Sequence, residues 1–246
     1  MTFAVENSTT ITREPSITPP SEVHASAHFT WYTVALCIYF VGVALLTRHI
    51  AHGVRPFNVV VRFIAVIIEW GLFFVAYRGI VVSGLRFPDV IGKHWSSRSG
   101  FWKDFKDSLL VIFIICVSTF LLVRLSPFTP SHTAPAKTGL QYLVTLLMAV
   151  TAGYTEEVIF RGFLLRQFQI LTRNLGVAVL LQAILFSLAH GGNQSVTQYL
   201  KHGFSACVFA YLSISRKSLW PAILAHVVLD VLAVTLQFLS AMNGKM

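Results

Sequence analysis

Long apolar stretches recur along this chain, and they limit it to a fold built from membrane-crossing helices. Of its 246 residues, 55% are hydrophobic and only 12% are charged, whereas soluble domains are about 25% charged. Inside a bilayer every backbone polar group must find its partner within a helix or a closed barrel. Because the stretches approach the roughly 20 residues that a spanning α-helix needs, we predict an all-α, polytopic transmembrane helical bundle. We expect about seven spans, within a range of six to eight.

The expected spans are separated by polar segments and by segments that contain Pro or Gly. They lie at residues 29–46, 59–82, 108–125, 139–170, 177–190, 196–214 and 219–240. The fourth would be about 48 Å long at 1.5 Å per residue, so its end should project beyond the hydrocarbon core. Residues 86–106 mix Trp and Phe with Lys and Arg, which is typical of an interfacial segment.

The chain divides into a short tail and one membrane domain. Residues 1–28 are polar and rich in Ser, Thr and Pro, which predicts a disordered tail. Residues 29–246 are expected to form a single transmembrane helical domain. The three cysteines, Cys37, Cys116 and Cys207, lie in apolar runs without motif spacing, so we expect neither a disulfide framework nor a cysteine-based metal site.

The formal net charge of +9 reflects membrane orientation rather than nucleic-acid binding. No basic run alternates with aromatic residues on a polar face, and we expect no nucleic-acid partner. With seven spans, the loops on the side of the N-terminus carry more Lys and Arg, which predicts a cytoplasmic N-terminus. Those loops hold Arg86, Lys93, Arg98, Lys103, Lys106, Arg166, Arg173, Arg216 and Lys217, and the opposite loops hold Arg48, Arg55, Lys137 and Lys201.

Two adjacent carboxylates, Glu156 and Glu157, interrupt the fourth apolar stretch. Charges at membrane depth cost at least about 2.5–3.5 kcal/mol, and such residues usually have a function. Arg161 follows Glu157 by four residues, so the two share a helix face and can pair. Glu156 points about 100° away. We predict that Glu157 and Arg161 support the structure and that Glu156 reacts; alternatively, all three simply hold helices together.

Two later apolar segments add His190, at the end of the fifth, and His226 and Asp230, which share one face of the seventh. Each has a structural alternative: a helix-end histidine, and an intrahelical His–Asp hydrogen bond. Together with Glu156 they suit peptide hydrolysis, which needs a base to activate water and donors for the oxyanion. Glu156, His190 and His226 could also bind zinc and leave a position open for water, although the His-Glu-x-x-His signature is absent.

These residues resemble the motifs of the CAAX-protease and bacteriocin-processing (CPBP, or Abi) family of intramembrane proteases, which is related to the Ras-converting CAAX prenyl endopeptidase. The motifs are Glu-Glu-x-x-x-Arg at residues 156–161, Phe-x-x-x-His at residues 186–190, and His-x-x-x-Asn or a variant at residues 226–230. They lie within a core of residues 139–235. The chain departs from the family at Asp230, because an ionised Asp cannot donate to an oxyanion; it could orient His226 or favour a metal.

The resemblance implies an intramembrane endopeptidase that acts on membrane-associated protein or peptide substrates. Glu156 would activate water with His190, His226 and Asp230 would stabilise the oxyanion, and Glu157 and Arg161 would support the site. The enzyme would be of the glutamate type or a metalloprotease, with zinc or with no cofactor. We expect an integral protein of a bacterial cytoplasmic membrane.

Two other functions fit the same residues. One is a non-enzymatic immunity or scaffold protein that keeps the fold. The other is a proton-coupled transporter, because intramembrane Glu and His also build proton relays. Glu69, in the second apolar stretch, suits the transporter slightly better, although it could also be paired or reach the interface. No inverted repeat, a common sign of transporters, is visible.

Overall fold

A computed structural model describes residues 28–48, 57–93, 95, 97–125, 134–191 and 194–244. Residues 1–27 of the expected tail at residues 1–28, and Arg55, lie outside these ranges. All regular elements within them are helices, which confirms the all-α prediction. They are α2 (Trp31–Arg48), α3 (Val59–Val82), α4 (Phe87–Ile91), α5 (Arg98–Leu125), α6 (Gly139–Glu157), the π-helix η1 (Val158–Leu164), α7 (Leu165–Thr172), α8 (Leu175–Ala189), α9 (Val196–Arg216) and α10 (Trp220–Met242).

Five segments of the described residues are long and apolar enough to cross a bilayer. They are Trp31–Arg48, Val59–Val82, Arg98–Arg124, Gly139–Thr172 and Trp220–Met242. The other two expected spans are present as helices but do not meet this measure: α8 has only 15 residues, and the first turns of α9 carry Gln198, Lys201 and His202. The protein is therefore an integral, multi-pass helical bundle.

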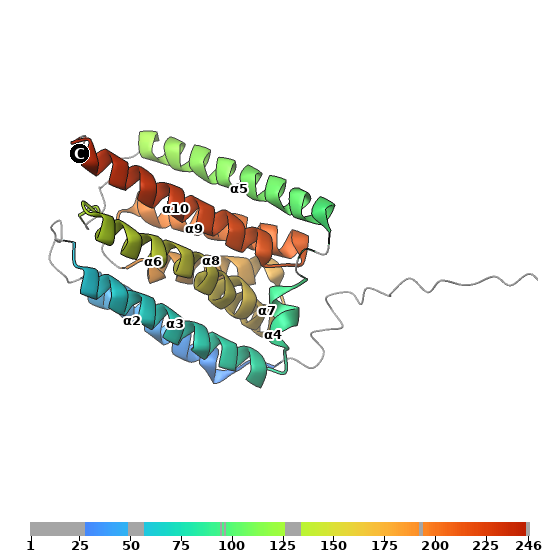
Figure 1. The fold of residues 1–246 in the computed structure, drawn as a ribbon. Coiled ribbons are helices and arrows are strands. Elements are labelled where there is room, and N and C mark those ends of the chain that lie inside the picture. Colours follow the sequence, from blue (N-terminus) through green and yellow to red (C-terminus); the bar gives the residue numbers. More distant parts are fainter. Residues whose placement is uncertain are drawn as a thin grey trace, which may run out of the picture.

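The helices form two layers (Figure 1). In the first layer α6 packs against α3 on one side and α10 on the other, and α10 also packs against α5. Behind them α8 and α9 pack against each other, with α2 beside α8. This arrangement brings residues from both halves of the chain to one interior space.

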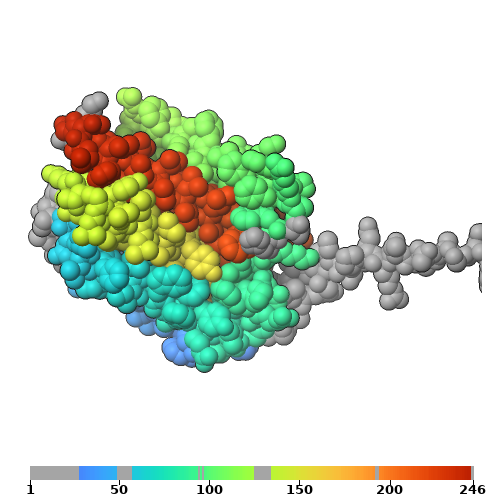
Figure 2. Space-filling view, viewed as in Figure 1, coloured from blue at the N-terminus to red at the C-terminus, as the bar shows by residue number. Residues whose placement is uncertain are grey.

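The outward face of the first layer is apolar, as lipid requires. Figure 2 shows α3, α6, α10 and α5 side by side on this face. Many large hydrophobic side chains of α3 and α5 are exposed, among them Ile67, Phe74 and Phe113. Since such side chains would be unfavourable in water over so wide an area, this face fits the hydrocarbon core.

One end of the bundle is held by contacts between its loops. The backbone N–H of Leu219 donates to the carbonyl of Ile91 over 2.8 Å, and Arg216 Nε donates to Asp104 Oδ1 over 2.6 Å. Gly92 has φ +82°, and a Cβ there would lie 2.6 Å from the Lys217 carbonyl oxygen, so only glycine fits. These contacts fix the starts of α5 and α10 relative to each other and to the end of α9.

Candidate active site

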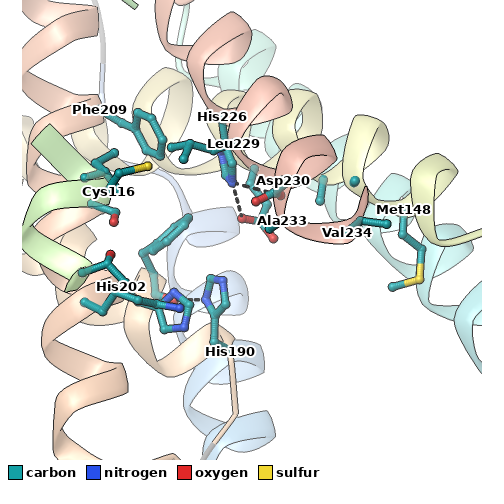
Figure 3. Close-up of a pocket in the computed structure, with 18 of the residues that line it drawn as sticks. Cys116, Met148, His190, His202, Phe209, His226, Leu229, Asp230, Ala233 and Val234 are labelled. Atoms are coloured by element: carbon teal, nitrogen blue, oxygen red, sulfur yellow. Dashed lines mark hydrogen bonds and ion pairs between the residues drawn. The ribbon is translucent and has the colours of Figure 1, made fainter. Parts of the chain in front are cut away.

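A cavity of about 730 Å³ lies between α3, α5, α6, α8, α9 and α10. Four residues predicted from the sequence line it together: Glu156, His190, His226 and Asp230. Figure 3 shows His226 and Asp230 on one wall and His190 on the facing wall. Three motifs that are far apart in the sequence therefore meet in one space.

The predicted pair of Glu157 and Arg161 is present behind the cavity wall. Arg161 Nη1 donates to Glu157 Oε1 over 2.9 Å, and both side chains are 0% exposed. Arg161 Nη2 also donates to the carbonyl of Ala206 over 3.3 Å. The guanidinium lies over the rings of Phe186 and Phe209, 4.5 and 5.3 Å from their centroids. Buried charges need this kind of compensation.

The polypeptide leaves α6 through the π-helix η1, directly after the two carboxylates. The N–H of Leu165 donates to the carbonyl of Phe160, which is the i→i+5 pattern of a π-helix. Its seven residues are all buried. Short π segments occur frequently at functional sites, and this one holds Arg161 within reach of both Glu157 and α9.

His226 is surrounded by three carboxyl groups. Its Nδ1 lies 2.8 Å from Glu157 Oε1, and because the ionised carboxylate only accepts, Nδ1 carries the hydrogen. Its Nε2 lies 3.5 Å from Asp230 Oδ2 and 3.9 Å from Glu156 Oε2. The ring stacks on Phe209 with centroids 4.9 Å apart. The imidazole is thus fixed in orientation, with Nε2 on the side of Glu156 and Asp230.

His190 is held differently, by the backbone of its own helix. Its Nδ1 lies 2.8 Å from the carbonyl of Phe186, which can only accept, so Nδ1–H is the donor and the neutral ring keeps its lone pair on Nε2. The ring of His202 stacks on it, with centroids 3.9 Å apart, and His202 also lines the cavity. Sequence reasoning missed His202, because no spacing relates this residue of α9 to the three motifs.

Glu156 shares the cavity with His190 but forms no hydrogen bond or ion pair with it among the described residues. Its Oε2 is buried and has no hydrogen-bond partner in the same part of the chain. This oxygen is an unsatisfied acceptor that belongs to a cavity-lining residue; behind the wall, Glu157 Oε2 is likewise without a hydrogen-bond partner among the described residues. Glu69, from α3, also lines the cavity. From the sequence we considered Glu69 a residue that is paired or reaches the interface, and this position in the cavity wall was not predicted.

We tested whether the candidate ligands Glu156, His190 and His226 fit a metal ion. Within the described residues no three His, Cys, Asp or Glu side chains come close enough to hold one. His226 uses Nδ1 for Glu157, and His190 lies on the facing wall of the cavity (Figure 3). In this arrangement the three residues do not fit a shared ion, and we derive no step through a metal.

Comparison with known families agrees with the motifs. Residues 138–232 match the family model described as type II CAAX prenyl endopeptidase Rce1-like. Comparison with curated proteins gave no match, and neither did comparison with solved structures. The matched segment runs from the start of α6 into α10 and contains all three motifs. The predicted resemblance to the CAAX protease family is therefore confirmed over residues 138–232, in a chain that is an integral multi-pass membrane protein.

Proposed function

We propose that this protein is an intramembrane endopeptidase that hydrolyses peptide bonds of membrane-associated protein or peptide substrates. One observation carries the proposal: Glu156, His190, His226 and Asp230, which come from three separate helices, line a single cavity. Acyl transfer to water needs a base, a held water molecule and a donor for the oxyanion. The four residues supply these groups.

Glu156 is the proposed base. Its buried Oε2 has no hydrogen-bond partner among the described residues, so it can accept one from water. His190 is the proposed second contact of that water, because Nε2 of its neutral ring is free to accept. Glu156 takes one proton as the hydroxide oxygen bonds to the scissile carbonyl carbon. When the C–N bond breaks, Glu156 returns that proton to the leaving amine.

His226 is the proposed oxyanion donor. Its Nδ1–H is held by Glu157, so the ring is oriented before substrate arrives. When the ring carries its second proton, Nε2–H can donate to the oxyanion that forms on the former carbonyl. Asp230, 3.5 Å from Nε2, orients the ring and balances its charge. The buried Glu157–Arg161 pair fixes the wall behind it, as proposed for supporting residues.

Cleavage by the purified protein tests the proposal. The probe is a library of internally quenched peptides with apolar, membrane-inserting sequences, presented in detergent micelles. Glu156→Gln keeps the shape of the side chain but removes the base, and should lower kcat/KM by about 10²–10⁴-fold. Asp89→Asn is the matched control, since it makes the same chemical change on a carboxylate that is 54% exposed. Equal activity of Glu156→Gln and wild type would contradict the role of Glu156.

Adding a chelator distinguishes a glutamate-type reaction from a metal-dependent one. Cleavage that needs Glu156 and survives chelation supports the glutamate-type reaction written above. Cleavage that chelation abolishes and zinc restores would instead assign His190, His226 and a carboxylate as ligands. If folded wild-type protein cleaves no peptide of the library, while its cellular effect survives Glu156→Gln, the immunity or scaffold function is favoured.

We also propose that the N-terminus is cytoplasmic and that the host membrane is a bacterial cytoplasmic membrane. The support is that one end of the bundle carries Arg98, Lys103, Lys106 and Lys217, near the loop contacts described above, as the positive-inside rule requires of a cytoplasmic end. Reporter fusions to the N-terminus and after α10 would test this. A reporter active only outside the cytoplasm should stay inactive at the N-terminus.

A further inference from the structure

The wall of the site contains a second carboxylate, that of Glu69, together with Glu156. Besides the large cavity, a smaller one of about 240 Å³ lies between α2, α3 and the α6–η1 segment. Its lining is otherwise mainly apolar, with Phe40, Ile68 and Phe160 among its residues. Glu69 and Glu156 line both cavities. These two side chains therefore belong to the walls of both cavities.

The two carboxylates are not joined by a hydrogen bond. Glu156 Oε2 is buried without a partner among the described residues, whereas Glu69 Oε2 lies 3.3 Å from the hydroxyl of Thr151, which donates to it. Because both side chains line the same two cavities, the two carboxylates repel each other when both are ionised. Between charges in a medium of low dielectric constant, repulsion of this kind is much stronger than in water.

The charged residues near Glu69 and Glu156 line the large cavity rather than the small one. In the large cavity His226 Nε2 lies 3.9 Å from Glu156 Oε2 and attracts it when the ring carries its second proton. Lys201 and Asp230 also line this cavity. In the small cavity the other lining residues are Tyr39, Thr155 and apolar residues, none of which carries a charge at neutral pH. Arg62, on the same helix as Glu69, lines only the large cavity. Since α6 packs between α3, which carries Glu69, and α10, which carries His226, repulsion from Glu69 and attraction from His226 act on Glu156 in the same direction.

We propose that Glu69 is a positioning residue whose negative charge keeps the Glu156 carboxylate turned toward His226 and the large cavity. This inference rests on the proposed function, because it assigns Glu69 a part in orienting the base of that reaction. Glu69 lies on α3, outside the segment that matches the family model at residues 138–232. The site would thus depend on a helix that the family resemblance does not cover.

Two substitutions separate a role of the charge from a role of the shape. Glu69→Gln keeps the length of the side chain and can still accept from Thr151, but it removes the charge. Glu69→Asp keeps the charge and shortens the side chain. If the charge positions Glu156, Glu69→Gln should lower kcat by about 10–100-fold with KM little changed, because a misplacement of about 1 Å at a reacting group can cost about 10²-fold in rate. Glu69→Asp should retain more of the wild-type kcat than Glu69→Gln does. The reverse order would overturn the proposal.

Thermal unfolding in detergent tests the same interaction without any substrate. Removing one of two repelling carboxylates should raise the unfolding temperature, so Glu69→Gln should be more stable than wild type, with Asp89→Asn unchanged. In a Glu156→Gln background the gain from Glu69→Gln should disappear, because no repulsion is left to relieve. Additive effects, or a loss of stability in Glu69→Gln, would overturn the proposal. Coupling between the two residues in a protein that cleaves no peptide would leave the positioning interaction standing while the proposed function fails.

Discussion

Arg161 carries a charge that three neighbours compensate at the centre of the bundle. It donates to Glu157 and to the carbonyl of Ala206, and it lies over Phe186. Arg161→Met would leave Glu157 buried without its cation, with the His226 imidazole as its remaining partner, and loss of one partner of a buried ion pair costs about 3–5 kcal/mol of unfolding free energy. Denaturation in mixed micelles should show this loss. Arg86→Met is the matched control: that side chain is 81% exposed, so its loss should have no measurable effect. Equal stability of both variants would contradict the account of the buried pair.

Asp230 is the residue at which the chain departs from the family motif. Its role can be tested with a substitution that changes the chemical group but keeps the size of the side chain. An Asn amide can donate to the oxyanion and accept from His226 Nε2, so Asp230→Asn should keep kcat within about tenfold of wild type. Asp230→Ala removes both contacts and should cost on the order of 10²-fold. The measurement is kcat for one cleaved peptide. If Asp230→Asn is as inactive as Asp230→Ala, the carboxylate itself is needed.

Some of these residue contacts follow from the sequence and others do not. The spacing of Glu157 and Arg161 predicted their ion pair, because four residues bring two side chains to one face of a helix. The pairing of His226 with Glu157 joins two elements, and no local rule predicts it. The stacking of His202 on His190 depends on how α9 packs beside α8, so a single histidine in α9 gave no signal.

At the scale of elements, Gly153 sets the approach of α6 to α10. A Cβ at this position would lie 2.6 Å from Val227 Cγ2 and 2.9 Å from the Val227 backbone nitrogen. Gly153→Ala must push the helices apart beside His226, and overpacking of this kind costs about 1–3 kcal/mol. Because Glu156 and His226 lie on these two helices, we also expect kcat to fall by about tenfold or more.

Gly42→Ala is the matched control for the helix-packing prediction. No atom lies within 4 Å of a Cβ built at Gly42 in α2, so the change should leave kcat unaltered and stabilise the helix by about 0.5–1 kcal/mol. Comparing unfolding and cleavage of the two variants measures the effect of the close approach itself. A Gly153→Ala protein with wild-type kcat would show that the Glu156–His226 distance does not depend on this contact.

Helix ends were predictable where the local chemistry is strong. The second predicted span coincides with α3 at Val59–Val82. Capping boxes at Thr138 and Ser195 agree with the predicted starts at residues 139 and 196. The π-helix was not predictable, because the i→i+5 pattern has no signature in sequence and arises where Arg161 packs between Glu157 and α9. The predicted span at residues 196–214 is present as the helix α9, whose first turns are more polar than the five candidate spans.

At the scale of the whole molecule, the reaction requires water to reach a cavity inside a membrane-embedded bundle. Glu69, Lys201 and Asp230 line that cavity beside the proposed catalytic groups, and such polar walls favour water over lipid. Cys116 on α5 lines it as well. Phe113 lies one helical turn earlier on α5, is 65% exposed and does not line the cavity. Cys116 is itself exposed, so the two positions compare a side chain that lines the cavity with one that does not, on a single helix.

A water-soluble methanethiosulfonate reagent distinguishes these two environments, because a thiol reacts as the thiolate, which forms in contact with water. Two variants reconstituted in lipid are compared. The first carries Cys37→Ala and Cys207→Ala, so Cys116 is its single cysteine; the second lacks Cys116 as well and carries Phe113→Cys. Cys116 in the first should react at least about tenfold faster than the cysteine at position 113 in the second. The adduct at Cys116 would occupy the cavity, so peptide cleavage should fall in proportion to labelling, while labelling at position 113 should leave it unchanged. Mass spectrometry quantifies the adducts, and the same samples are assayed for cleavage. Equal labelling rates would mean that the cavity is closed to water in the bilayer, and would remove the source of the nucleophile from the proposed reaction.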